Sequence, residues 1–133
     1  DHFGSVPSLA VALCVWIAAA LVTYWADGKG DIWFAGTLMG LAMGATQAGG
    51  RALIGPLTPE SRNAEIFGLW GLANRAAAII GPVSYGVVSQ WSDGDHRLAL
   101  LSTLSFFLLG LLTLVSVNEA RGKLAREQVM ADT

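Results

Sequence analysis

Four long stretches with almost no charged side chains make up most of this chain of 133 residues. Three of them, 8–26, 32–50 and 98–118, contain no charge at all. At a rise of about 1.5 Å per residue, each would form a helix of about 28–32 Å, which matches the roughly 30 Å hydrocarbon core of a bilayer. Only 14% of the residues are charged, against about 25% in ordinary soluble domains. The sequence therefore predicts an all-α membrane protein with four transmembrane helices, over residues 8–26, 32–55, 66–91 and 98–117.

Basic side chains are concentrated on one side of this predicted bundle. With four spans, the N-terminal flank, the loop 56–65 and the tail 118–133 share a side, and the opposite side holds Lys29 and Arg97 among four aspartates. Because Lys and Arg are enriched in cytoplasmic loops, the flank, the loop and the tail are predicted to be cytoplasmic. The tail is expected to be a solvated end with the composition of a mixed-charge helix. The basic residues of this side are Arg62, Arg121, Lys123 and Arg126, with Arg51 near the boundary.

The start of the chain does not have the features of a removable signal peptide. The flank before the first run contains no Lys or Arg and has the character of a loop between two spans. The chain begins with Asp1 rather than Met, so we expect a fragment of a longer protein. Cys14 is the single cysteine, which argues against a disulfide framework and redox chemistry. No metal site, cofactor site or catalytic cluster is predicted, and the chain is not expected to be an enzyme.

The second run carries a stripe of small residues. Gly36, Gly40 and Gly44 recur at four-residue intervals, a spacing that lets a neighbouring helix approach closely. Gln47 lies on roughly the same side, and Arg51 follows one turn later. One interpretation places Gln47 and Arg51 beside a translocation pathway. In the alternative, Gln47 bonds to a neighbouring helix and Arg51 extends its side chain to the cytoplasmic surface.

Arg75 is the only charged residue of the third run, 66–91. Charged side chains inside a membrane span generally face a cavity or other protein and often mark a functional site. At 100° per residue, Arg75 shares its helix face with small or polar residues, and bulky apolar residues occupy the opposite face. We therefore expect Arg75 to face protein or a cavity, where it meets a solute, or an acidic side chain of a helix outside these four. Small or polar residues within about 40° of Arg75 include Gly68, Gly71, Pro82, Gly86 and Ser89.

Gly81 and Pro82 follow Arg75 by two turns. Proline removes the hydrogen bond to the carbonyl of Ala78 and kinks the helix. In a transporter such a break can act as a hinge or expose backbone to a cavity. A static kink that improves packing is the alternative interpretation.

An ordered series of motifs runs through the middle of the chain. The series consists of Gln47-Ala48-Gly49-Gly50-Arg51-Ala52-Leu53, Leu57-Thr58-Pro59-Glu60, Ala64-Glu65-Ile66-Phe67-Gly68-Leu69-Trp70, Asn74-Arg75 and Ile80-Gly81-Pro82. It resembles the late helices of the major facilitator superfamily, and in particular its vacuole-effluxer (autophagy-related) branch with bacterial relatives. In addition, the first four residues resemble the remnant of the Asp-Arg-x-Gly signature of that superfamily, with His2 in the arginine position. This substitution weakens the motif as a gating latch.

The resemblance implies that the four spans are the last four helices of a twelve-helix transporter. The second run would line the central cavity, the third would lie at the interface of the two halves, and the first and fourth would be peripheral. Such proteins move a small solute by alternating access, and members of the eukaryotic branch are associated with amino-acid efflux. Arg75, Asn74, Gln47 and Arg51 would bind the solute or gate its passage.

The partners implied are the lipid bilayer, the N-terminal helices of the same transporter and a small-molecule solute, but not nucleic acid. The bacterial relatives imply the inner (plasma) membrane of a bacterium. The alternative function is a four-helix membrane subunit that packs with partner proteins and transports nothing.

Overall fold

The computed structural model describes residues 4–131, apart from the side chains of Glu119, Ala120, Lys123 and residues 129–131. Within this part the chain is helical and has no strand, which confirms the all-α prediction. The residues that resemble the superfamily signature, Asp1 to Phe3, lie outside the described part. The elements in order are α1 (Ser5–Tyr24), α2 (Lys29–Leu57), the 3-10 helix η1 (Glu60–Arg62), α3 (Asn63–Trp91), α4 (His96–Val115) and α5 (Glu119–Ala131).

Three helical segments are long and apolar enough to cross a membrane: α1, residues 60–91 with α3, and α4. Helix α2 has the length for a span, with 29 residues, but is not among these three. Its glycines and threonines and Gln47 lower its hydropathy. The membrane-protein class is therefore supported by the segments on either side of α2, and a fourth span through α2 stays a prediction.

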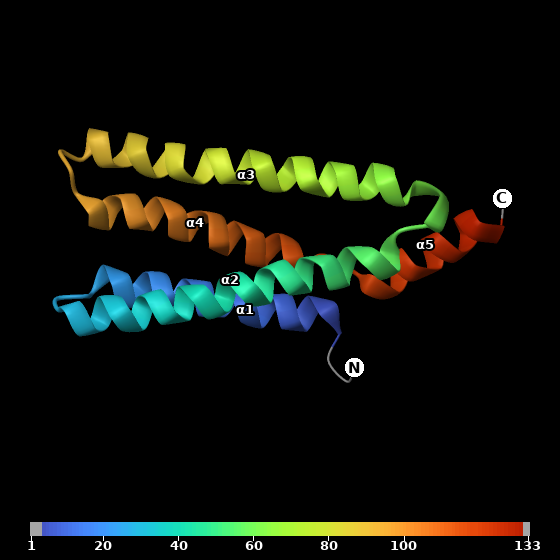
Figure 1. The fold of residues 1–133 in the computed structure, drawn as a ribbon, viewed down its shortest axis with the longest axis horizontal. Coiled ribbons are helices and arrows are strands. Elements are labelled where there is room, and N and C mark those ends of the chain that lie inside the picture. Colours follow the sequence, from blue (N-terminus) through green and yellow to red (C-terminus); the bar gives the residue numbers. More distant parts are fainter. Residues whose placement is uncertain (1–3, 132–133) are drawn as a thin grey trace.

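The four long helices lie alongside one another in the order α2, α1, α4, α3 (Figure 1). Helix α2 packs along α1, α1 also contacts α4, and α4 contacts α3. As a result α2 and α3 are the outer helices of the row. We call the end with η1 the loop end and the end with the turns 25–28 and 92–95 the turn end.

The contacts inside the bundle are made mainly by small side chains. Alanines account for six of the seven buried apolar residues in the described part, and such side chains let helix backbones approach closely. The side chain of Leu9 in α1 lies over Gly49 of α2, in the space that a Cβ atom at Gly49 would occupy. One aromatic contact joins α1 to α4, because the rings of Trp16 and Phe107 stack with their centroids 5.0 Å apart. The buried alanines are Ala12, Ala19, Ala20, Ala35, Ala42 and Ala99.

Helices α1 and α5 each donate a hydrogen bond to a backbone carbonyl near the loop end of α2. Pro56 has no N–H to offer the carbonyl of Ala52, and that oxygen instead accepts a hydrogen bond from the Ser5 hydroxyl of α1 at 3.4 Å. The carbonyl of Pro56 accepts a hydrogen bond from Arg126 of α5 at 3.3 Å. Leu57 packs against Gly122 of α5. The tail is helical as its composition suggested, but the expectation of a solvated end was wrong for the face that contacts α2.

Loss of the stacked pair should destabilise the bundle. We expect Trp16→Ala to lower the free energy of unfolding by about 1–3 kcal/mol, because it removes the aromatic contact between α1 and α4. Trp91→Ala is the matched control, since Trp91 is 85% exposed, and should change stability by less than about 0.5 kcal/mol. Unfolding of the full-length protein in detergent measures both. Equal effects of the two variants would contradict the packing described here.

The contact between α5 and α2 can be tested by cross-linking. In a Cys14→Ser background, cysteines at Leu57 and Gly122 should form a disulfide on mild oxidation, because these positions touch. A pair at Leu57 and Leu124 is the control, since Leu124 is 59% exposed. Gel mobility with and without reductant reports the bond. A tail that moves free in solvent would cross-link both pairs to the same small extent.

Candidate functional site

The glycine stripe of α2 faces away from the rest of the bundle. A Cβ atom added at Gly36, Gly40 or Gly44 would meet no atom within 4 Å. Gln47, on the same side, is exposed and has no hydrogen-bond partner in the described part of the chain. No helix among the described residues uses this stripe for packing. The stripe, which suits close helix contact or a solute pathway, is therefore not covered by any described part of this chain.

Helix α3 is also open on one side, and none of its residues is buried. It meets α4 through Ala77, Ile80 and Gly81, which line a crevice of about 410 Å³ together with side chains of α4. Ala77 and Ile80 are two of the residues that the sequence places opposite Arg75. The face that contains Arg75 therefore points away from α4. That this face meets protein or a cavity stays a prediction.

Arg75 is exposed and has neither a hydrogen bond nor an ion pair with any described residue. The ion pair found in the described part lies elsewhere, between Arg97 and Asp27 at 3.6 Å. Because the guanidinium stays protonated at accessible pH, it requires water, an anion or an acidic partner wherever it lies within a membrane. These four helices supply no such partner for Arg75.

Gln47 and Arg75 lie at similar depth in the bundle. Gln47 is ten residues from the end of α2 at Leu57, or about 15 Å, and Arg75 is twelve residues from the start of α3 at Asn63, or about 18 Å. Both side chains are on exposed faces of the two outer helices. The structure thus brings them to one level without direct contact between them.

Asn74 is partly engaged within its own helix. Its side-chain amide donates a hydrogen bond to the carbonyl of Trp70 at 2.9 Å. This leaves the amide oxygen and one N–H for another partner. The predicted contribution of Asn74 to solute binding stays a prediction, with fewer free groups than the sequence suggested.

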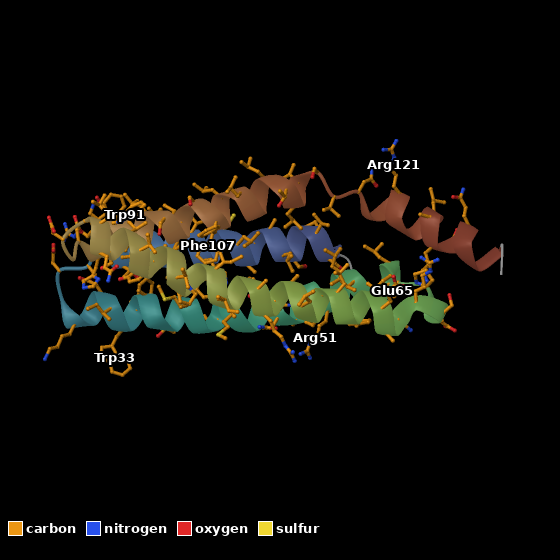
Figure 2. The ribbon with its side chains drawn as sticks, turned by 90° about the horizontal axis from the view of Figure 1, so that it is seen from above. Trp33, Arg51, Glu65, Trp91, Phe107 and Arg121 are labelled. Atoms are coloured by element: carbon orange, nitrogen blue, oxygen red, sulfur yellow. The ribbon has the colours of Figure 1, made fainter. Side chains whose placement is uncertain are left out.

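Arg51 reaches α3 in the structure. Its guanidinium carbon lies 5.7 Å from the ring centroid of Trp70, a cation–π contact between the two outer helices. Figure 2 labels Arg51 on α2. Trp70 also lies against Gly50. The sequence pattern places Trp70 about 140° from Arg75, among the bulky apolar residues of α3, and did not predict this contact. The available signal was that Arg51 is six residues from the end of α2 and Trp70 is seven residues from the start of α3, because a hairpin of two helices places such residues at similar depth.

Helix α3 runs without interruption through Gly81 and Pro82. The carbonyl of Ala78 lacks its usual helical partner, because Pro82 has no N–H. Gly81 borders the crevice towards α4. The unbroken helix is compatible with either a static kink or a hinge at Pro82, and both interpretations stay predictions.

A polar cluster joins three helices at the turn end. The Tyr85 hydroxyl and His96 Nδ1 are 3.1 Å apart, and their rings stack. Arg97 pairs with Asp27 and lies over the ring of Tyr24 at 5.8 Å. The sequence analysis did not anticipate these contacts, because they combine residues from separate turns. No group of three metal-ligating side chains occurs among residues 4–131, within the described side chains.

The long apolar segments and the open faces of α2 and α3 define a multi-pass integral membrane protein. Residues 8–127 match the family described as vacuole effluxer Atg22 like, and the chain belongs to this family. It is 25% identical over 119 residues to the uncharacterized MFS-type transporter YxiO of Bacillus subtilis, which covers 90% of this chain. It is 28% identical over 105 residues to autophagy-related protein 22 of Candida glabrata, which covers 74% of this chain. The resemblance inferred from the sequence motifs is confirmed.

The chain spans only part of these relatives: 28% of the Bacillus protein and 18% of the Candida protein. No solved structure matches the chain. A protein as long as these relatives contains further segments, and the residues described above would form only part of its corresponding surface.

The open face of α2 can be distinguished from a lipid-covered face by its reactivity. In a Cys14→Ser background, Gln47→Cys should react at least about tenfold faster with a charged thiol reagent than Leu108→Cys, because the reactive thiolate forms in water and not in hydrocarbon. Leu108 is exposed on α4 among apolar neighbours and serves as the matched control. Labelling in membranes of the full-length protein measures both rates. Equal rates would contradict a water-accessible face at Gln47.

Proposed function

We propose that this chain is part of a secondary active transporter that moves a small solute by alternating access. The proposal is supported by membership of the Atg22-like family and by the similarity to a protein named as an MFS-type transporter. In such transporters, rocking of two halves exposes a site near the bilayer midplane to either side in turn. The chain would supply the last four of twelve helices.

The observation that carries the proposal is the unpaired, exposed Arg75 in the middle of α3, level with Gln47 of α2. A cation at such a depth is costly in lipid, so the Arg75 face of α3 would be covered by water, by other helices or by a solute. Arg75 would bind an anionic group of the solute or a carboxylate in the opposite half. Gln47 and Asn74 would add neutral hydrogen bonds, and Arg51 would lie between this site and the loop end.

The order of the helices suits this arrangement. The outer helices α2 and α3 present open polar or glycine-rich faces, and α1 and α4 lie between them in the row. We propose that α2 lines the cavity, that α3 adjoins the other half of the transporter, and that α1 and α4 form the lipid-facing back of this part.

The finer points of the proposal concern solute, direction and membrane. Amino acids are the solutes to assay first, and the direction proposed is efflux. The proposed location is the inner membrane of a bacterium, with the loop 56–65 and the tail in the cytoplasm. The arginines of the loop end, Arg62, Arg121 and Arg126, support this orientation.

Replacement of Arg75 tests the proposed function. In the full-length protein, Arg75→Ala should reduce flux of labelled amino acids at least about a hundredfold while membrane insertion and abundance persist, because it removes the cation that the site requires. Arg75→Lys should retain part of the flux, since it keeps the charge but loses the planar guanidinium.

Arg121→Ala is the control, because Arg121 is exposed on α5 outside the proposed pathway. Flux through the Arg75→Ala variant equal to that of the unmodified protein would exclude the proposed site. A full-length protein that carries none of the labelled solutes, yet copurifies with other membrane proteins, would favour the packing subunit instead.

A further inference from the structure

Helix α3 has a backbone carbonyl without a helical donor near its midpoint. Pro82 has no N–H to give to the carbonyl of Ala78, and no side chain in the described part of the chain donates a hydrogen bond to that oxygen. Ala78 is 15 residues from the start of α3 at Asn63 and 13 from its end at Trp91. A free carbonyl in hydrocarbon is costly, so a donor from outside the helix is favoured at this depth.

This carbonyl lies on the Arg75 face of α3. At 100° per residue, Ala78 is about 60° and Pro82 about 20° from Arg75, both in the same direction around the helix. A helix carbonyl points along the axis towards the residue four positions later, so the oxygen of Ala78 lies between these two angles. The crevice towards α4 is lined by Ala77 and Gly81, further round the helix. Arg75, Ala78 and Pro82 are all exposed, so a cation and a free acceptor share one open face.

The cation and the acceptor are close together along the axis. Three residues separate Arg75 from Ala78, about 4.5 Å of helical rise. Side chains of a helix point back towards its N-terminus, so the guanidinium extends towards the loop end while the carbonyl oxygen points towards the turn end. A Cβ atom added at Gly71, one turn before Arg75, would meet no atom within 4 Å, which leaves the guanidinium room on the loop side. A ligand that spans both groups needs an anionic group at one end and a hydrogen-bond donor at the other.

We infer that the Ala78 carbonyl is part of the solute site and accepts a hydrogen bond from an ammonium group, while Arg75 binds a carboxylate of the same solute. The ligand class is a small zwitterion whose two charges are a few bonds apart. This inference rests on the proposed function and adds a backbone group to its site. A carboxylate of a neighbouring helix would satisfy Arg75 but has no proton to donate to the carbonyl, so a zwitterion fits the pair better. Pro82 would act by keeping the oxygen free.

A matched pair of ligands tests the role of the carbonyl. For an amino acid that the full-length protein carries, the amino acid should inhibit labelled flux at a concentration at least about tenfold lower than its des-amino carboxylic acid. Pro82→Ala restores the N–H that occupies the Ala78 carbonyl, so this preference should fall to about twofold or less. Pro82→Gly restores the same N–H and keeps the backbone flexible, and should reduce the preference equally.

Two controls separate the carbonyl from other effects near Pro82. The Ser84 hydroxyl donates to the carbonyl of Ile80 at 2.8 Å, about 140–180° around the helix from Arg75. Ser84→Ala should therefore leave the preference for the amino acid unchanged. Arg75→Lys should weaken the amino acid and its des-amino analogue by the same factor, because both ligands carry the carboxylate.

The results that overturn the inference differ from those that overturn the proposed function. A preference that is absent in the unmodified protein, or that persists in Pro82→Ala, would show that the carbonyl does not bind the amino group. Flux lost in Pro82→Ala but kept in Pro82→Gly, with the preference intact in the latter, would make Pro82 a hinge instead. Pro82→Gly carries the test if Pro82→Ala does not accumulate. Flux that survives Arg75→Ala, or no flux of any amino acid, would overturn the proposed function and this inference with it.

Discussion

The bundle depends on the burial of small side chains between its helices. In a bilayer the hydrophobic effect does not drive helices together, because lipid tails are as apolar as leucine, so association relies on packing and on a few polar contacts. The buried alanines of α1, α2 and α4 meet this requirement, and the Leu9 side chain of α1 lies over Gly49 of α2. The larger apolar side chains are left on the outside, where lipid can cover them. The row of helices follows from this distribution of small residues.

The same distribution explains why the site is open. Small residues occur on two sides of α2, but only the alanine side is occupied by a helix of this chain. The glycine side and the Arg75 face of α3 combine low steric bulk with polar groups that hydrocarbon does not satisfy. A surface with these two properties suits water, a solute or a further helix.

Much of the fold could be predicted from the sequence, because charge-free runs and helical periodicity are local properties. The helices were expected close to their observed limits, and the position of Arg75 on the opposite side of α3 from Ala77 and Ile80 follows from their angular spacing. Contacts between helices could not be predicted in the same way. The stacking of Arg51 on Trp70 and the hydrogen bond from Arg126 to Pro56 depend on how helices pair, which the composition of one helix does not specify. The tail was misjudged for this reason.

The hydrogen bond from Ser5 to Ala52 has a consequence for the order in which the chain assembles. Helix α2 is less apolar than its neighbours, and Pro56 removes the backbone donor that its Ala52 carbonyl would otherwise have within α2. The carbonyl is exposed near the loop end, so water can satisfy it until the Ser5 hydroxyl takes that place. During synthesis α1 emerges first, so the hydroxyl is already present when α2 is complete. The hydrogen bond therefore closes the hairpin of α1 and α2 once both helices have formed.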